Sequence, residues 1–259
     1  MAQSSQLPDK SLGQHWLRDE AALSAMCEEA GLQPDDTVLE IGPGLGSLTE
    51  LLVRHAKQVV AVEFDKKLAA GLSGRVPAAN LQTVSEDILR FDLTSLPPDY
   101  KIVANIPYYL TSKLLRVISE TPNPPVQAAI LVQKEVAKRV AAGPGDMSLL
   151  SVTAQFYWQV SLGREVAAEL FEPPPKVDSQ ILVLKHRPKP LFEVEVKAFF
   201  RLVKAGFSQR RKTLLNSLSS GLHLSREDTT ELLRKADIDP SRRPQTLSLQ
   251  EWAKLYTVF

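Results

Sequence analysis

The stretch Thr37-Val-Leu-Glu-Ile-Gly-Pro-Gly-Leu-Gly46 decides the fold of this chain. Its first five residues form a mostly apolar run of the kind found in buried β-strands. Glycines at positions 42, 44 and 46 follow at once, and a helical pattern begins at Leu48. Glycine tolerates the positive φ angles of a tight turn and lets a ligand approach the backbone without a Cβ in the way. We therefore predict a strand, a glycine turn and a helix, with a ligand site at the turn.

Strand and helix patterns alternate from about residue 20 to residue 187. Further strands are expected at residues 59–64, 81–84, 102–104, 129–132 and 181–184. Helices are expected at residues 21–30, 48–54, 67–72, 112–119 and 135–141. This alternation predicts an α/β fold with a parallel sheet covered by helices on both faces.

The pattern changes near residue 188, at Pro188-Lys-Pro190. From there on only helices are expected, at residues 194–204, 210–218, 226–236 and 249–258. Ser248 and Glu251 have the spacing of a capping box at the start of the last helix. We therefore predict one domain of residues 1–188 and a small all-helical domain of residues 189–259.

The composition is that of a globular protein, with 44% hydrophobic and 24% charged residues in a chain of 259. These values exclude collagen-like and wholly disordered chains. The single cysteine, Cys27, excludes an intrachain disulfide and a cysteine-based zinc site, and the four histidines are scattered. No signal peptide and no run of 18 apolar residues is evident. We expect a cytoplasmic protein with no membrane segment and no metal.

The net charge of +1 hides an asymmetry. Residues 185–259 contain fifteen Lys and Arg against eight Asp and Glu, which gives +7 and leaves −6 on the rest of the chain. A basic C-terminal part is typical of proteins that meet a polyanion. A solvated basic helix surface would have the same composition.

Carboxylates stand at the ends of the next two predicted strands, Glu63 at one and Asp87 at the other. At the carboxyl edge of a parallel sheet, Glu63 can accept hydrogen bonds from both ribose hydroxyls of a nucleoside, and Asp87 can meet an adenine amino group. The G-x-G-x-G spacing differs from that of dinucleotide binders, and no G-K-[ST] phosphate loop is present. A nucleoside site is favoured over ordinary loop acids beside a turn.

These three features resemble class I S-adenosylmethionine-dependent methyltransferases, which have a Rossmann-like, mostly parallel sheet. The resemblance implies S-adenosyl-L-methionine as cofactor and S-adenosyl-L-homocysteine as product. Because this cofactor carries a sulfonium cation and no phosphate, the absence of a phosphate loop is understandable. Glu40 could contribute negative potential near the sulfonium; its alternative role is to fix the glycine turn.

The motif Asn105-Ile-Pro-Tyr108 directly follows the fourth predicted strand. The resemblance implies that its target is an exocyclic amine of a base, a poor nucleophile because its lone pair is conjugated into the ring. The side-chain oxygen of Asn105 and a backbone carbonyl, that of Ile106, can accept the two N–H bonds and turn the lone pair toward the methyl donor without a strong base. Pro107 stiffens the turn, and Tyr108 can stack on the base, which is worth about 1–3 kcal/mol. The alternative is an ordinary turn with a packed tyrosine, and we expect the motif to line the same cleft as the glycines.

Three further segments complete the pattern: Gly13-Gln-His-Trp-Leu17, Phe171-Glu-Pro-Pro-Pro-Lys-Val-Asp-Ser179 and Phe207-Ser-Gln-Arg-Arg-Lys-Thr-Leu-Leu-Asn-Ser217. Together with the 105–108 motif they resemble the ribosomal RNA adenine N6,N6-dimethyltransferase family over nearly the whole chain. The resemblance is greatest to the bacterial enzymes that dimethylate two adjacent adenosines near the 3′ end of small-subunit (16S) ribosomal RNA, with a role in ribosome biogenesis.

The resemblance implies roles for the matched residues. The cofactor-binding set would be His15, Leu17, Glu40, Gly42, Gly44, Gly46, Glu63, Asp87 and Asn105. Phe171 would stack on the target adenine opposite Tyr108, with a loop anchor in the core as the alternative. Arg210, Arg211 and Lys212 would bind RNA phosphates, with a solvated helix face as the alternative. The implied partner is small-subunit ribosomal RNA in a partly assembled 30S subunit, bound by a monomer.

Two segments depart from the family pattern. His15-Trp16 stands where relatives usually have Asn-Phe, although His can also donate or accept a hydrogen bond. Residues 142–151 form a short segment that lacks the basic residue and the Tyr-Gly pair that relatives usually carry, so the sequence gives no support for an RNA contact by this loop.

Other functions share these motifs. A large-subunit (23S) rRNA adenine N6-methyltransferase of the macrolide-resistance type is one, and the segment from Phe207 favours the small-subunit enzyme over it. A noncatalytic ribosome-assembly or RNA-binding factor on the same fold is another, and the intact glycine turn, Glu63 and 105–108 motif argue against it. A cytosine-carbon methyltransferase is disfavoured because Cys27, the only possible nucleophilic cysteine, falls on a predicted helix away from the motifs.

Overall fold

The computed structural model describes residues 14–189, 191–209 and 211–259. Its packing divides the chain into two compact units. Unit 1 contains the residues up to Ala137 together with Gln159–His186, and unit 2 contains Lys138–Trp158 together with Arg187–Phe259. Unit 2 therefore includes residues 138–158, which the sequence pattern assigned to the N-terminal domain. The assignment of separate functions to residues 1–188 and 189–259 stays a prediction.

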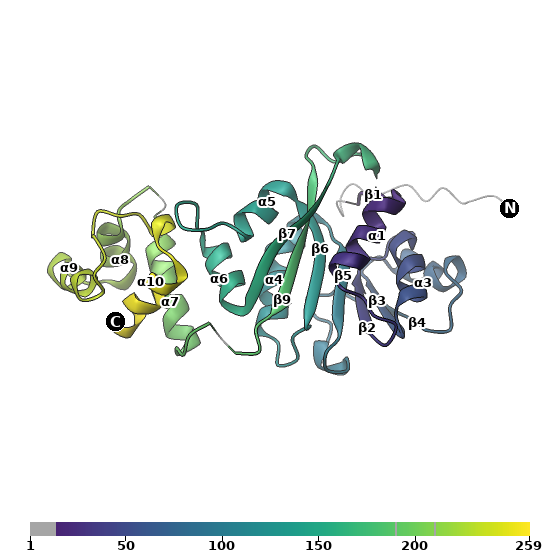
Figure 1. Cartoon of the computed structure of the whole chain (residues 1–259), viewed down its shortest axis with the longest axis horizontal. Coiled ribbons are helices and arrows are strands. Elements are labelled where there is room, and N and C mark those ends of the chain that lie inside the picture. The colour runs from purple at the N-terminus through teal and green to yellow at the C-terminus, as the bar shows by residue number, and fades with distance from the viewer. Residues whose placement is uncertain (1–13, 190, 210) are drawn as a thin grey trace. The chain divides into compact units, whose positions relative to one another are not determined.

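Unit 1 is built on a seven-stranded sheet with the strand order β4-β3-β2-β5-β6-β9-β7 (Figure 1). The strands are β2 (Thr37–Ile41), β3 (Gln58–Glu63), β4 (Leu81–Ser85), β5 (Lys101–Asn105), β6 (Gln127–Gln133), β7 (Trp158–Val166) and β9 (Ser179–His186). The five strands from β4 to β6 run parallel, and β9 pairs antiparallel with β6. The predicted α/β fold with a mostly parallel sheet is confirmed, whereas β7 was not predicted.

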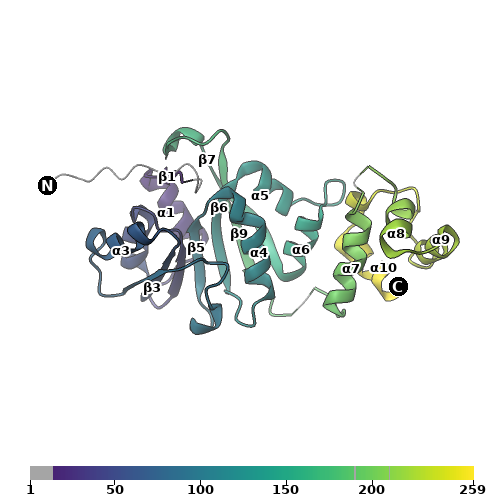
Figure 2. The ribbon, with the colours of Figure 1, turned by 180° about the vertical axis from the view of Figure 1, so that it is seen from behind.

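Helices cover both faces of this sheet. They are α1 (Glu20–Glu29), α2 (Ser47–His55), α3 (Lys66–Arg75), α4 (Thr111–Glu120) and the first part of α5 (Lys134–Val140). Figures 1 and 2 show α1 and α4 on opposite faces. Helix α4 buries Leu114, Leu115 and Ile118, while Lys113 and Arg116 are exposed. Such burial contributes about 1.5–3 kcal/mol per large aliphatic side chain, so the amphipathic pattern fixes which side of the helix packs.

The parallel register brings the chemically interesting residues to one edge of the sheet. Ile41 at the end of β2 lies between Val62 of β3 and Ala104 of β5. The residues that directly follow these three in the sequence therefore lie at the same level of the sheet: Gly42, Glu63 and Asn105. This is the carboxyl edge, where ligands of open α/β sheets bind.

Unit 2 is helical. Its helices are α6 (Leu149–Tyr157), α7 (Val196–Phe207), α8 (Leu214–Leu222), α9 (Arg226–Lys235) and α10 (Leu249–Thr257). Phe156 of α6, Phe199 of α7 and Trp252 of α10 are completely buried, and the rings of Phe156 and Phe199 stack with their centroids 5.4 Å apart. This aromatic core explains why residues 149–157 belong to unit 2 and not to the sheet. The all-helical C-terminal part is as predicted, but α6 was not.

Helix α8 begins at Leu214, four residues after the predicted start. The backbone N–H of Lys212 donates to the Gln209 carbonyl at 2.9 Å, and that of Leu214 donates to the Arg242 carbonyl at 2.7 Å. A turn and a contact with the 239–243 loop therefore set the start of this helix, which helix propensity alone could not indicate. Arg211 and Lys212 are exposed on this turn, and Arg210 lies outside the described residues.

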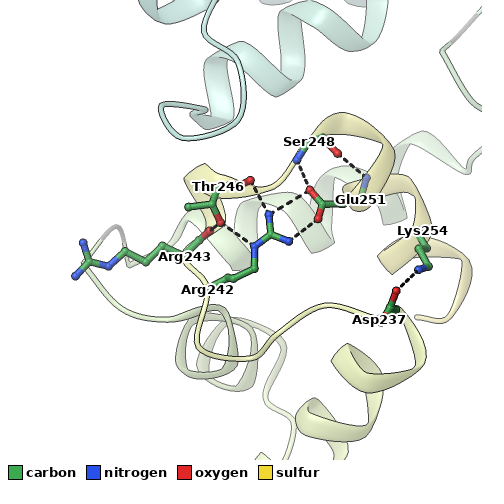
Figure 3. A network of polar contacts seen from close by, with 7 residues as sticks. All are labelled: Asp237, Arg242, Arg243, Thr246, Ser248, Glu251 and Lys254. Carbon is green, nitrogen blue, oxygen red and sulfur yellow. Dashed lines mark hydrogen bonds and ion pairs between the residues drawn. The ribbon is translucent and has the colours of Figure 1, made fainter.

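A network of polar contacts holds the loop before α10 (Figure 3). The Arg242 guanidinium donates to both carboxylate oxygens of Glu251 and, at 2.7 Å, to the Thr246 carbonyl. Ser248 and Glu251 form the predicted capping box, with bonds of 3.1 and 2.7 Å. The hydrogen bond from Arg242 lowers the pKa of Glu251 to about 2. The Arg243 carbonyl accepts from the Thr246 hydroxyl at 2.8 Å, whereas the Arg243 side chain extends away from the network.

Within the described parts of the chain, no helix has the length and apolar character needed to cross a membrane.

Candidate active site

The glycine turn follows β2 as predicted. Gly42, Gly44 and Gly46 all have positive φ angles, of 68°, 57° and 98°. The Gly42 N–H donates to the Val62 carbonyl at 2.9 Å, and the Gly44 N–H donates to the Glu63 carboxylate at 3.0 Å. Strand β3 thus fixes the turn, both through its backbone and through its last side chain.

Gly46 has a different role from the other two glycines. It caps the start of α2, and a Cβ there would lie 2.8 Å from Val76 and 3.1 Å from Leu72. Gly46 therefore lets α2 begin against the end of α3. It does not line the cavity described below, and its predicted role in cofactor binding stays a prediction.

Glu63 is buried, and backbone groups bond to both of its carboxylate oxygens. One oxygen accepts from Gly44, and the other accepts from the Asp65 N–H at 2.9 Å. Burial raises the pKa of Glu63, and these hydrogen bonds oppose the rise. Each oxygen keeps a second lone pair, so the carboxylate can still accept a ligand hydroxyl.

Asp87 lies two residues beyond the end of β4. One of its carboxylate oxygens accepts from the Leu89 N–H at 3.0 Å, which orients the side chain in the turn after the strand. It lies in the cavity wall together with Glu63 and the glycine turn, as the sequence predicted.

The 105–108 motif begins on the last residue of β5 and enters a short 3-10 helix, Tyr108–Leu110. The amide nitrogen of Asn105 donates to the His15 carbonyl at 3.3 Å. This bond uses the nitrogen of the amide and leaves its oxygen as the acceptor of the side chain. The Tyr108 hydroxyl bonds to Ser179 at 2.7 Å, which fixes the position of the hydroxyl end of its side chain. Pro107 precedes the 3-10 helix with a φ of −55°.

The N-terminal segment closes one side of the site. A two-stranded sheet pairs β1 (Trp16–Leu17) with β8 (Phe171–Glu172). A ring nitrogen of His15 bonds to the Pro173 carbonyl at 2.7 Å, and its ring lies nearly parallel to that of Tyr108 with centroids 6.1 Å apart. His15 thus contacts both the 171–173 segment and the 105–108 motif.

These elements enclose a cavity of about 270 Å³. The predicted residues in its wall are His15, Leu17, Glu40, Gly42, Gly44, Glu63, Asp87, Asn105, Ile106, Pro107 and Tyr108. The structure therefore brings the glycine turn and the 105–108 motif to one cleft, as expected. A volume of this order suits a small-molecule ligand.

Phe171 is not part of this wall. It pairs with Leu17 across the β1–β8 sheet, is only 4% exposed, and packs in the hydrophobic core of unit 1. This is the packing that the loop-anchor alternative describes, and the proposed stacking of Phe171 on a base stays a prediction.

Two buried polar groups in the cavity wall have no partner among the described residues. Glu40 is 1% exposed, and neither of its oxygens is in hydrogen-bonding geometry with a donor. Burial raises the pKa of Glu40 to about 8; the Thr49 hydroxyl lies close enough to lower it and the Glu63 carboxylate raises it further. The indole N–H of Trp16 is also buried without a partner. A ligand that carries a cation and a hydrogen-bond acceptor would satisfy both groups.

The sequence motifs did not identify several residues of the wall. Phe64 directly follows Glu63 and is 61% exposed, and Tyr109 is 58% exposed; both line the cavity, as do Trp16 and Lys113. An aromatic residue next to a strand-ending acid was a usable signal for Phe64. Exposed aromatic rings at a cleft are typical of surfaces that stack on bases.

Cys27 lies on α1, is buried and is not in the cavity wall. Burial is the main cause that raises the pKa of its thiol to about 11. It is therefore a poor nucleophile, in agreement with the argument against cysteine-based chemistry. The described residues contain no group of three or more side chains suited to a metal ion.

Comparisons with known proteins agree with this geometry. A family model described as ribosomal RNA adenine dimethylase matches residues 7–258. A protein named ribosomal RNA small subunit methyltransferase A, from Dehalococcoides mccartyi, is 43% identical over 255 residues, which cover 96% of this chain and 88% of that protein. The crystal structure of the 23S rRNA methyltransferase ErmE has a TM-score of 0.76 and 29% identity, and covers 94% of this chain and 98% of that one. That of a dimethyladenosine transferase from Plasmodium falciparum has a TM-score of 0.78 and 25% identity, and covers 93% and 96%. With its predicted methyltransferase fold confirmed, this chain belongs to the ribosomal RNA adenine dimethylase family.

Proposed function

We propose that this protein transfers methyl groups from S-adenosyl-L-methionine to the N6 amines of two adjacent adenosines near the 3′ end of small-subunit (16S) ribosomal RNA, giving N6,N6-dimethyladenosines. The observation that carries the proposal is that the 105–108 motif and the glycine turn line the same cavity. A donor bound at the glycines would lie within reach of an amine held by Asn105. The D. mccartyi relative, named as a small-subunit methyltransferase, supports the choice of subunit.

The buried polar groups of the cavity wall that lack hydrogen-bond partners suit the groups of the cofactor. The buried Glu40 carboxyl suits a cationic centre, and the Trp16 indole N–H suits the carboxylate of an amino acid. Glu63 and Asp87 keep lone pairs for ribose hydroxyls and an adenine amino group, and Phe64 offers an aromatic face. When bound, S-adenosyl-L-methionine supplies a methyl group on a positively charged sulfur.

Asn105 and Ile106 provide the acceptors for the target amine. Because the amide nitrogen of Asn105 is bound to the His15 carbonyl, its oxygen can accept one N–H of the amine, and the Ile106 carbonyl can accept the other. Both bonds strengthen as the amine gains positive charge, since charge-assisted hydrogen bonds are roughly twice as strong as neutral ones. Tyr108, fixed by Ser179, would stack on the flipped base.

We further propose that the protein acts as a monomer in the cytoplasm on a partly assembled 30S subunit. Exposed Arg211 and Lys212 of unit 2, with Arg210, would bind RNA phosphates there. A folded RNA target would be recognised by its shape and its unpaired bases.

The test is methyl transfer to ribosomal subunits that lack these modifications. Purified protein and S-adenosyl-L-methionine carrying a labelled methyl group are incubated with small and large subunits separately, and the modified nucleotides are mapped by mass spectrometry. We expect dimethylation of two adjacent adenosines near the 3′ end of the small-subunit RNA and none in the large subunit. Transfer to the large subunit alone would favour the macrolide-resistance type of activity. No transfer and no cofactor binding would favour a noncatalytic assembly factor.

A further inference from the structure

Glu40 is an unusual residue for the middle of a buried parallel sheet. It lies on β2 between Ala61 and Val103 of the neighbouring strands, which offer it no polar side chain. It lines the cavity, and none of the ion pairs among the described residues includes it. A buried charge without a partner is strongly disfavoured, so the geometry favours a neutral carboxyl group when the cavity holds no cation.

The groups around Glu40 reinforce this. Glu63 of β3 adds negative charge, Cys27 of α1 is a buried thiol, and Thr49 of α2 contributes a neutral hydroxyl. Arg75 reaches the glycine turn, but its guanidinium donates to the carbonyls of Gly44 and Leu45. Lys113 lines the same cavity, but no cation is among the causes that shift the pKa of Glu40, so we assign a positive charge beside Glu40 to a ligand.

We propose that Glu40 distinguishes the sulfonium cofactor from its thioether product by exchanging a proton. This inference rests on the cofactor of the proposed function. Glu40 releases a proton to solvent when the sulfonium binds. In methyl transfer the electron pair of the S–CH₃ bond stays on sulfur, the methyl group bonds to the adenine nitrogen, and that nitrogen loses a proton. The sulfur is then neutral, so Glu40 takes up a proton again. The product is no longer held by an ion pair and can exchange for fresh cofactor before a second transfer.

The experiment is titration calorimetry of the full chain with three ligands, in buffers that differ in ionisation enthalpy. The ligands are S-adenosyl-L-methionine, S-adenosyl-L-homocysteine and sinefungin, in which an ammonium-bearing carbon replaces the sulfonium. Since the pKa of Glu40 is about 8 in the ligand-free protein, roughly 0.9 proton should be released at neutral pH by each cationic ligand and almost none by the homocysteine. The dissociation constant of the cationic ligands should also rise by up to about tenfold for each pH unit below pH 8, because the carboxyl must lose its proton to bind them, while that of the homocysteine stays within about twofold.

Two variants sharpen the test. In Glu40→Gln the proton release should disappear, and the preference for cationic ligands over the homocysteine should shrink. Cys27→Ala is the matched control, because it removes a neighbouring titratable group and should leave the proton release unchanged. If Glu40→Gln does not fold, the comparison of the three ligands with the unaltered protein still decides.

Three results would overturn the inference. Equal proton release by S-adenosyl-L-methionine and S-adenosyl-L-homocysteine would mean that Glu40 senses the ammonium group that both ligands share. Proton release that persists in Glu40→Gln would assign it to another group of the protein. Failure of all three ligands to bind would remove the proposed function as well, whereas binding of all three without a difference in protons would remove this inference alone.

Discussion

Replacement of Asn105 by Ala separates cofactor binding from methyl transfer. On the cofactor side, the variant loses the bond from the amide nitrogen to the His15 carbonyl. At 3.3 Å this bond is long, so we assign it about 0.5 kcal/mol, the lower end for a net hydrogen bond. That energy corresponds to a two- to threefold change in the dissociation constant of the cofactor. On the transfer side, the variant loses an acceptor for an amine that becomes positively charged, and removal of one preorganised transition-state hydrogen bond costs about 10²–10³ in kcat.

The assay combines single-turnover transfer to small subunits with calorimetric titration of S-adenosyl-L-methionine. We expect the rate of transfer to fall by at least about a hundredfold while the dissociation constant changes by no more than about threefold. Asn123→Ala is the control, because the Asn123 side chain also donates to backbone carbonyls, those of Leu93 and Leu96, but lies outside the cavity wall. It should leave transfer unchanged. A rate within threefold of the unaltered protein in Asn105→Ala would refute the acceptor role, and a hundredfold loss of cofactor affinity would make Asn105 chiefly a cofactor ligand.

Three further predictions concern packing and pH. Gly46→Ala should lower the free energy of unfolding by about 2–4 kcal/mol, because the new Cβ would lie 2.8 Å from Val76 at a φ of 98°; an unchanged urea midpoint would contradict this. Phe171→Leu should cost less than about 1.5 kcal/mol of stability and leave transfer nearly unchanged if the ring only packs, whereas a large loss of kcat in a folded variant would support base stacking. The pKa of Glu251 is about 2, below its usual 4.5, so its bond to Arg242 stabilises the protein above pH 4.5 and is lost as the pH falls from 4.5 to 2. Glu251→Gln should therefore flatten the stability profile in that window by about 1 kcal/mol, as measured by thermal unfolding at several pH values.

The sequence predicted the central sheet well because its strands have a strong and local signature. Strands β2, β3, β5 and β6 are mostly buried apolar runs bounded by turns, whereas β4, at the edge of the sheet, includes Gln82 and Thr83 and is only partly buried. Strand β7, Trp158–Val166, has no such signature, since it contains Gly163 and the charged pair Arg164 and Glu165. Its pairing with β9 depends on a tertiary arrangement that local propensity does not contain.

The candidate site also contains residues that local sequence signals identify and residues whose surroundings depend on tertiary contacts. Glu63, Asp87 and Asn105 were predictable because parallel strands end at one edge, so residues at strand ends must converge. For Phe171 the sequence left two alternatives open, base stacking and a loop anchor, because its burial follows from pairing with Leu17, a contact between residues far apart in the sequence. The same holds for Gly46, where a Cβ would lie too close to Val76, a residue distant in the sequence. It also holds for Trp16, because only the folded structure shows that its indole N–H is buried without a partner.

The two transfers to one nitrogen place different demands on the same residues. An unmodified amine has two N–H bonds, which match the Asn105 oxygen and the Ile106 carbonyl. A monomethylated amine has one N–H bond, so only one of these acceptors can hold it in the second transfer. The first methyl group must then occupy the place of the lost hydrogen bond, at a polar acceptor that it leaves unpaired, and an unpaired buried acceptor costs about 1–3 kcal/mol. The second transfer is therefore expected to be the slower one, by about tenfold or more.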